Sequence, residues 1–463
     1  MEMSSDSPAS LAAVLERLDA LIDWERRTRG PGERGQAMRV DLEPVTDLLS
    51  LLGRPDRTLC CVHVAGSKGK GSVSSLVAAG LKAAGLRVGR FASPHVERLT
   101  ERVLIDGAEV EDAVLAAALQ AALDAREVAI KDQSEGKDAT WFDCLTAAAL
   151  LVFEDADLGF AVIECGLGGR LDSTNVVVGD VCVVTNIELE HTEILGSTRA
   201  EIAFEKVSIL GRGAGLVTGV PPAPDEAGYV IDKHVEMMET RAIRPDWALG
   251  TAEIPRSIDQ RNKDLAGLVL DELGRRRWGV GEGPGRVASG VLSAALLTAE
   301  VCIEARLPGR MEVFEHSAGL VVLDGAHVPG SVKAVLDDLQ DRRGLQSAPI
   351  VVLGLGADKD RESILKILGS RSERLICTSV GNRTAASPGE LVENAKRFEV
   401  AAEMAVTPQI ALSRALELAQ EQNATSGSSA PWILITGSLH LIGALRPTLR
   451  QTARPIPLPP TQC

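Results

Sequence analysis

The chain has 463 residues, of which 45% are hydrophobic and 24% are charged, and its formal net charge is −15. This composition is typical of a globular protein of roughly two or three domains and excludes a disordered chain. The acidic balance argues against nucleic-acid binding, because nucleic-acid-binding proteins present a basic surface. There is no apolar stretch of membrane-spanning length and no signal-peptide core, and the eight cysteines show neither CxxC pairs nor zinc spacing. We therefore expect a cytoplasmic protein with reduced thiols and with neither a nucleic-acid nor a membrane partner.

The first part of the chain leads into a glycine-rich turn. Apolar spacing predicts helices at residues 8–29 and 42–52. The run VHVAGSKGKGS at residues 62–72 then combines a β-branched strand, a glycine turn and the start of a helix. In that context, consecutive backbone N–H groups and the positive helix end favour a bound phosphate, and Lys70 can reach its terminal groups. The glycines are closer than in the commonest Walker A loop, so an ordinary tight turn with a solvated lysine is the alternative.

Two further segments follow the glycine-rich turn before the chain reaches its most informative stretch. Residues 86–95 predict a strand that ends in a turn, and residues 101–107 predict a short strand and a second turn. Taken alone, the tripeptide Ser93-Pro94-His95 is an ordinary turn, and His95 is interpreted as structural. Residues 140–146, which include Asp143, open a helix rich in Ala and Leu.

The run AVIECGLGGRLDSTN at residues 161–175 places a single carboxylate, Glu164, between a buried-type strand and a glycine loop. Because ligands of open α/β sheets bind at the carboxyl ends of the strands, Glu164 stands where a metal ligand would. A further strand, predicted at residues 181–187, is followed by His191 and by a helix that carries Lys206. A strand-end glutamate in solvent is the alternative for Glu164 considered alone.

The signals are weaker from residue 215 to residue 300. Val217 and residues 229–231 suggest strands, and residues 262–273 suggest a helix that begins at Asn262. In the last third of the chain, strands are predicted at residues 320–324, 350–354, 375–379 and 432–436. These strands alternate with helical segments, which implies a second, parallel, Rossmann-like sheet.

Taken together, these motifs resemble the folylpolyglutamate synthase/dihydrofolate synthase family of the Mur ligase superfamily, from about residue 40 to about residue 445. The resemblance is carried by VAGSKGKGS, SPH with the later ER pair, ECGLGGRLDSTN, His191 with the later IAFEKV, LPGR, DGAHVP and DKD. The chain departs from the usual pattern at several positions. They are Lys68 for Asn (some members also have Lys), Asp143 for Glu, Glu190 for Asp, Leu307 for Trp and Val328 for Asn.

The resemblance implies an α/β protein of two parts. A P-loop, Mur-ligase-like ATPase domain with a predominantly parallel sheet is expected over residues 1–300. A smaller Rossmann-like α/β domain of the glutamate-ligase type is expected over residues 301–463. The linker near residues 297–310 would then be a hinge, and we expect the protein to be a monomer.

The resemblance also implies a reaction, the ATP-dependent formation of an amide. A substrate carboxylate attacks the γ-phosphorus of ATP, and the amine of L-glutamate then displaces phosphate from the acyl phosphate. The acceptor would be dihydropteroate, a folate chain or both, and the residues leave this choice open. Two other interpretations are an amino-acid ligase of another Mur type and an inactive nucleotide-binding paralogue. The GKGS loop and the GLGGRLDSTN string favour the folate branch, and the retained Lys70, Glu164, His191, Lys206 and Asp324 argue against inactivity.

The resemblance assigns site residues residue by residue. The catalytic set is Lys70, Lys206 and His327, with His327 as a candidate base for the incoming amine. The ATP-binding set is Gly66, Ser67, Lys68, Gly69, Lys70, Gly71, Ser72, Asn262, Arg310 and Asp324. The metal set is Ser93, Glu164 and His191, and the glutamate side is Asp324, His327 and Ser438. Mg²⁺ prefers oxygen ligands and keeps several waters, which suits a sparse set built on Glu164 and Ser93; a carbamylated Lys206 could hold a second Mg²⁺.

Overall fold

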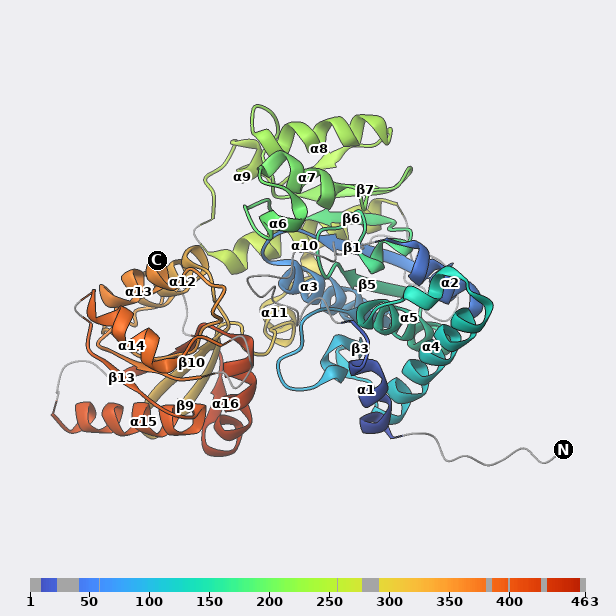
Figure 1. The fold of residues 1–463 in the computed structure, drawn as a ribbon. Helices are drawn as coiled ribbons and strands as arrows, with labels where there is room; N and C mark the ends of the chain where they lie inside the picture. The colour runs from blue at the N-terminus through green and yellow to red at the C-terminus, as the bar shows by residue number, and fades with distance from the viewer. Residues whose placement is uncertain are drawn as a thin grey trace. The chain divides into compact units, whose positions relative to one another are not determined.

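The computed structural model describes residues 10–22, 41–57, 59–255, 257–276, 291–379, 385–398, 400–425 and 431–458. The chain divides into two compact units, unit 1 from Met1 to Ala305 and unit 2 from Arg306 to Cys463 (Figure 1). The predicted boundary between residues 300 and 301 falls inside helix α11 (Ala299–Glu304). That helix belongs to unit 1, where the Ser75 hydroxyl donates a hydrogen bond to the Ala305 carbonyl at 2.7 Å. The boundary therefore lies just after the helix.

Unit 1 is built on an eight-stranded sheet in the order β4-β3-β2-β5-β1-β6-β7-β8. Its strands are β1 (Cys60–Ala65), β2 (Val88–Phe91), β3 (Val103–Ile105), β4 (Ala108–Glu109), β5 (Phe160–Glu164), β6 (Val181–Val184), β7 (Gly215–Thr218) and β8 (Ala242–Ile243). The six strands from β2 to β8 in this order are parallel, and β3 and β4 add an antiparallel edge. The predicted, predominantly parallel sheet is confirmed.

Helices cover both faces of this sheet, as Figure 1 shows. They are α1 (Leu11–Asp19), α2 (Glu43–Leu51), α3 (Lys70–Ala83), α4 (Asp112–Asp132), α5 (Trp141–Asp155), α6 (Thr192–Leu195), α7 (Arg199–Val207), α8 (Glu226–Met237), α9 (Asp246–Leu249), α10 (Ile258–Arg275) and α11. Alternate residues of a strand point to opposite faces, so Val162 of β5 packs beneath α3 and α10, whereas Ala161 and Ile163 pack against α5. The strands are apolar on both sides because both faces are covered.

The central strand β1 fixes the position of the site. Both of its neighbours, β5 and β6, are parallel to it, and the chain passes from β1 to β2 on one side and later to β6 on the other. The strand order therefore reverses at β1. In open α/β sheets this reversal opens a crevice at the carboxyl ends of the strands. The glycine-rich turn that follows β1 stands at that crevice.

Unit 2 contains a seven-stranded sheet in the order β13-β12-β11-β14-β10-β9-β15. Its strands are β9 (Glu312–His316), β10 (Gly319–Asp324), β11 (Ile350–Leu353), β12 (Arg374–Cys377), β13 (Ala402–Met404), β14 (Trp432–Thr436) and β15 (Arg454–Ile456). Its α-helices are α12 (Pro329–Leu336), α13 (Arg361–Gly369), α14 (Pro388–Lys396), α15 (Pro408–Thr425) and α16 (Leu439–Thr452). Five neighbouring strands are parallel, and β9 pairs antiparallel with both β10 and β15, so the mostly parallel second sheet is confirmed.

Two local predictions differ from the structure. Residues 229–231 lie inside α8 instead of forming a strand, because Asp225 caps this helix through Gly228 N and Ala227, Ile231 and Val235 form its buried face. The first predicted helix, residues 8–29, is shorter: α1 begins after Ser10, whose hydroxyl caps it, and ends at Asp19. Residues 8–9 and 23–29 of that prediction lie outside the described residues.

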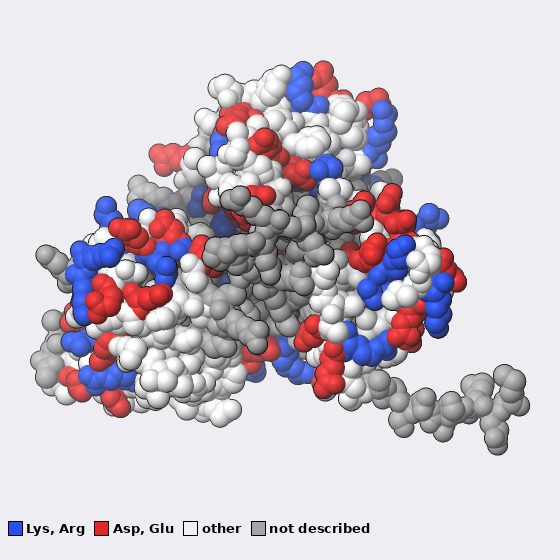
Figure 2. Space-filling model, viewed as in Figure 1, with Lys and Arg blue, Asp and Glu red and all other residues white. Residues whose placement is uncertain are grey.

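The charged side chains are distributed without a single dominant sign over the face drawn in Figure 2, where Lys and Arg alternate with Asp and Glu. In the described part of the chain, no helix combines the length and apolar character needed to span a bilayer.

Candidate active site

The glycine-rich turn joins β1 to α3 and requires its glycines. Gly66 and Gly69 have φ values of +141° and +82°, which L side chains rarely adopt. A Cβ atom on Gly66 would lie 1.9 Å from Thr185 Oγ1, and one on Gly69 would lie 2.6 Å from Asn262 Oδ1. The turn is therefore pressed against the loop after β6 and against α10. The predicted Asn262 lies beside it, buried.

Two residues that sequence analysis missed hold this turn in place. The backbone carbonyl oxygen of Asn186 accepts a hydrogen bond from Ser67 N at 3.0 Å. Its side-chain oxygen, Oδ1, accepts one from Lys68 N at 2.8 Å. Thr185 Oγ1 donates to the Lys68 carbonyl at 2.6 Å. The amides of Ser67 and Lys68 are thus used within the protein. Lys70, Gly71 and Ser72 form the first turn of α3, in which the backbone N–H groups have no acceptor within the helix. These N–H groups can therefore bind a phosphate.

Three lysine ammonium groups converge on the turn. Lys70 Nζ and Lys206 Nζ donate to the same carbonyl oxygen, that of Gly66, at 2.9 and 3.1 Å. Lys206 also pairs with Glu190 at 3.0 Å, and Lys68 Nζ lies 3.5 Å from the other oxygen of Glu190. Three cations therefore surround one carboxylate, which leaves an excess of positive charge where triphosphate oxygens would bind.

Burial and charge set the protonation of this group. Burial lowers the pKa of Lys206, as does the neighbouring Lys70, whereas Glu190 acts in the opposite direction. Burial alone would raise the pKa of Glu190, but the ammonium groups of Lys206, Lys70 and Lys68 outweigh it, so that pKa is lowered. Glu190 is therefore ionised at neutral pH and is the counter-ion of Lys206.

The predicted metal ligands stand at or after the carboxyl ends of three parallel strands, β2, β5 and β6, of which only β2 and β5 are adjacent. Glu164 is the last residue of β5 and is 3% exposed, Ser93 stands two residues after β2, and the exposed His191 follows β6. In the described part of the chain, no group of three or more His, Cys, Asp and Glu side chains could hold a metal ion. One carboxylate with the hydroxyl of Ser93 still fits Mg²⁺, which completes its shell with water and substrate phosphates.

A buried hydrogen-bonded group behind the turn was also missed by sequence analysis. His63 of β1 is fully buried, and burial lowers its pKa to about 3, so the ring is neutral. His63 Nε2 lies 2.9 Å from Thr174 Oγ1 and 3.2 Å from Cys165 Sγ. The Thr174 hydroxyl donates to Asp172, whose other oxygen accepts from Leu167 N at 2.7 Å. This group ties β1 to the glycine loop at residues 166–175.

The same glycine loop positions Lys206. Arg170 N donates to the Glu205 carbonyl at 2.7 Å, and the Arg170 guanidinium pairs with the Glu205 carboxylate at 2.8 Å. A Cβ atom on Gly169 would lie 2.6 Å from the Glu205 carbonyl oxygen and 3.1 Å from Lys206 Cα. The loop after Glu164 therefore sets the place of α7, and with it the place of the Lys206 ammonium.

Unit 2 brings its four predicted residues to the carboxyl ends of β10 and β14. Asp324 accepts from the amides of Met311 and Ala326, both at 2.9 Å, so it orders the turn that carries Arg310. A Cβ atom on Gly325 would lie 2.6 Å from Arg310 Nη1. Ser438 caps α16, and the neighbouring Gly437 N donates to the Ala326 carbonyl.

The ring of His327 has a defined tautomer. Its Nδ1 lies 2.9 Å from the Gly325 carbonyl oxygen. Because a carbonyl oxygen only accepts hydrogen bonds, Nδ1 carries the proton, and Nε2 is the nitrogen that can take one up. A base for an incoming amine would have to use Nε2.

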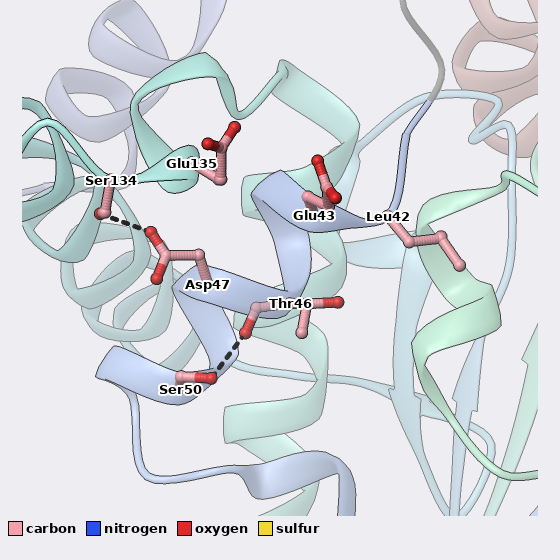
Figure 3. Close-up of a pocket in the computed structure, with 7 residues that line it drawn as sticks. All are labelled: Leu42, Glu43, Thr46, Asp47, Ser50, Ser134 and Glu135. Atoms are coloured by element: carbon pink, nitrogen blue, oxygen red, sulfur yellow. Dashed lines mark hydrogen bonds between the residues drawn. The ribbon is translucent and has the colours of Figure 1, made fainter.

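A separate surface hollow of about 460 Å³ lies beside α2 (Figure 3). It is lined by Leu42, Glu43, Thr46, Asp47, Ser50, Ser134 and Glu135, none of which is a predicted site residue. Asp47 is engaged by Ser134 Oγ at 2.5 Å and by Gly136 N at 2.7 Å. Its acidic lining does not suit a polyphosphate, so the site is assigned to the glycine-rich turn.

Comparisons with known proteins identify relatives of this chain. Residues 309–439 match the family model of the Mur ligase, glutamate ligase domain. The chain is 30% identical to the folylpolyglutamate synthase of Lacticaseibacillus casei over 425 residues, which cover 88% of this chain and 94% of that one. It is also 30% identical to a probable bifunctional folylpolyglutamate synthase/dihydropteroate synthase of Halobacterium salinarum, of whose length the match covers about half, 51%.

Solved structures show the same fold over almost the full length. A Mycobacterium tuberculosis folylpolyglutamate synthase complexed with ADP matches with a TM-score of 0.77 and 26% identity, over 95% of this chain and 98% of that one. Escherichia coli FolC in complex with DHPP and ADP matches with a TM-score of 0.74 and 25% identity, over 96% and 98% of the two chains. A Yersinia pestis folylpolyglutamate synthase/dihydrofolate synthase complexed with AMPPNP and Mn ion matches with a TM-score of 0.70 and 26% identity, over 97% and 100%.

Proposed function

The chain belongs to the folylpolyglutamate synthase/dihydrofolate synthase family, and we propose that it is an ATP-dependent ligase that joins L-glutamate to the carboxylate of a folate-type acceptor. The observation that carries this proposal is the convergence of Lys70 and Lys206 on the Gly66 carbonyl, at the carboxyl end of β1. Such a group offsets the negative charge of a triphosphate beside a second anion, the acceptor carboxylate.

The first step is phosphoryl transfer. The acceptor carboxylate attacks the γ-phosphorus of ATP and forms an acyl phosphate, with ADP as the leaving group. Lys70 and the first amides of α3 hold the phosphate oxygens as charge moves toward them. Glu164, Ser93 and His191 would hold Mg²⁺, which supplies further positive charge to the phosphates when bound.

The second step is amide formation. The amine of glutamate attacks the acyl carbon, and phosphate leaves. The amine must lose a proton, and His327 Nε2 is our candidate to accept it because Nδ1 is already protonated. We assign Arg310 to the nucleotide phosphates, and Asp324 and Ser438 to the ordered turns that receive glutamate.

Carbamylation of Lys206, which the family resemblance implies, would replace this ammonium with an anion. In the structure Lys206 Nζ pairs with Glu190 Oε1 at 3.0 Å. A carbamate there would stand beside a like charge, so its formation requires Glu190 to turn away or a cation to lie between the two groups.

The acceptor decides between dihydrofolate synthesis and folate polyglutamylation. The test is to incubate the purified full chain with ATP, Mg²⁺ and labelled glutamate, together with either dihydropteroate or a folate monoglutamate. We expect one ADP for each glutamate incorporated with at least one of the two acceptors. Absence of acceptor-dependent ADP formation with both would overturn the proposed function, and turnover with a cell-wall acceptor only would favour a ligase of another Mur type.

A further inference from the structure

Arg90 is a buried cation that the reaction outlined above does not use. It is the third residue of β2, and its neighbour in β5 is Val162. A Cβ atom on the preceding residue, Gly89, would contact Phe153 of α5, so Gly89 faces α5. Because side chains alternate, Arg90 faces the opposite side of the sheet, that of α3.

Glu164 lies on that same face. It stands two residues after Val162, which packs beneath α3, and alternation returns it to the α3 side. Arg90 and Glu164 are therefore diagonal neighbours on adjacent parallel strands, near the carboxyl ends. Glu164 is the last residue of β5, at the edge of the sheet where the metal and the phosphates would bind.

The surroundings of Arg90 are unusual for a cation. The residue is 7% exposed, and in the described part of the chain nothing accepts a hydrogen bond from its enclosed Nη1. Burial lowers the pKa of Arg90, and the charges of Glu164 and Glu101 oppose that shift. An arginine keeps its proton in proteins, so the site contains a permanent positive charge of low exposure.

The carboxylate of Glu101, the other acidic group that acts on Arg90, binds backbone amides. Its carboxylate accepts hydrogen bonds from Val96 N and Glu97 N, both at 2.7 Å, and from Arg98 N at 2.9 Å. It therefore orders the turn after Ser93. Glu164 is the carboxylate through which the charge of Arg90 acts on a ligand of the site.

A fixed cation at this place has opposite effects on two ligands. It repels a free divalent cation that approaches Glu164. It attracts the phosphates of a nucleotide, and a metal–triphosphate complex is a net anion. Because the guanidinium is buried, solvent screens neither interaction as strongly as it would at the surface.

We propose that Arg90 makes the Glu164 site select a divalent cation carried on nucleotide phosphates over the free cation. This inference rests on the proposed function, since it takes Glu164 as a metal ligand. The metal and the nucleotide then enter together, and the site stays empty of metal until a polyphosphate is present. Each ligand raises the affinity for the other, because coupling between two binding events is reciprocal.

The test is direct binding of Mn²⁺ to the full-length protein, followed by electron paramagnetic resonance. For Arg90→Met, we expect free Mn²⁺ to bind about tenfold more tightly and the Mn²⁺ complex of a non-hydrolysable ATP analogue to bind several-fold more weakly, since the charge of Arg90 acts on both ligands. Arg87→Met is the matched control. Arg87 precedes the same strand, but its side chain is 55% exposed, so both affinities should stay at the wild-type values.

Opposite changes in the two affinities support the proposal. Unchanged affinities, or a parallel loss of both, overturn it. Arg90→Gln removes the charge and keeps polar hydrogens, so it replaces Arg90→Met if that variant does not fold. Arg90→Lys keeps the charge, so it should preserve the wild-type preference for Mn²⁺ bound to nucleotide over free Mn²⁺. Glu164→Gln tests the underlying assignment separately: if it binds the Mn²⁺–nucleotide complex like wild type, Glu164 is not a metal ligand, whatever Arg90 does.

Discussion

Lys206 Nζ lies 3.0 Å from Glu190 Oε1, and the Lys206 side chain is only 2% exposed. The two residues belong to different segments, the loop after β6 and helix α7. Their contact is made possible by the glycine loop at residues 166–175, which lets α7 approach the sheet. A buried ammonium is costly unless it is paired, so this contact is where the stability of unit 1 and the charge of the site depend on each other.

Glu190→Gln should lower the free energy of unfolding by about 1–3 kcal/mol, because it leaves a buried cation with a neutral partner. The pKa of Lys206 should fall further. The double variant Glu190→Gln with Lys206→Met should regain part of the loss, since the buried charge is gone. Urea unfolding of the full chain measures this, with the exposed Glu193→Gln as control. A double variant less stable than the single one would contradict the pairing.

Lys70→Ala should reduce turnover about 10²–10³-fold, because a preorganised contact to the transferring phosphate is lost. Steady-state ADP formation with saturating substrates measures this. Lys82→Ala, in the exposed last turn of the same helix, should leave turnover and unfolding unchanged. A Lys70→Ala enzyme with more than about half the wild-type turnover would remove the lysine from the phosphate site.

Gly169→Ala should lower both stability and turnover. Its new methyl group would meet the Glu205 carbonyl at 2.6 Å and push α7 outward, at a cost of about 1–3 kcal/mol. Since Lys206 moves with α7, kcat should fall more than KM for ATP rises. Gly211→Ala is the matched control because no atom lies within 4 Å of its Cβ position. Equal kinetics for both variants would show that the loop does not place Lys206.

The stability of unit 1 should depend on pH through His63. Burial lowers the pKa of this residue from 6.5 to about 3. Below pH 6.5 the unfolded chain therefore binds a proton that the folded protein excludes, and stability falls as the pH falls toward 3, by up to about 1.4 kcal/mol per pH unit. His63→Gln lacks this contribution. The difference in unfolding free energy between the two proteins should therefore shrink as the pH falls from about 7 to about 5. Parallel curves would mean that His63 takes up its proton at the same pH in the folded and the unfolded protein.

The residues of unit 2 should separate nucleotide binding from glutamate incorporation. His327→Ala and Asp324→Ala should largely abolish incorporation of labelled glutamate and leave affinity for a non-hydrolysable ATP analogue within several-fold of wild type. Arg310→Ala should weaken that affinity more clearly, because a guanidinium on a phosphate makes a charge-assisted contact. Calorimetric titration next to the glutamate assay measures both. Normal incorporation by both His327→Ala and Asp324→Ala would exclude a catalytic part for this turn.

Much of the architecture follows from local sequence. The β-branched runs that end at Gly66, Glu164 and Asp324 predict strands followed by turns, because strand formation depends on a few adjacent residues and glycine permits the turn. Alternation of strands and helices predicts two mostly parallel sheets, and both are present. Local pattern fails at residues 229–231, where an N-cap at Asp225 and a helical apolar face prevail over the β-branched pair.

The site itself depends on contacts that no local pattern contains. Thr185, Asn186 and Asn262 reach the glycine-rich turn from other elements, and His63 meets Thr174 across 111 positions. Arg90 looks like any charged residue in a strand until the order β2-β5-β1 puts it beside Glu164 on a covered face. The sequence by itself determined most of the strands and the turns that follow them, but it misassigned residues 229–231 and the end of the first helix. Only the tertiary structure decided which charges share a buried space, because burial and Coulomb interactions depend on distance in space and not on separation along the chain.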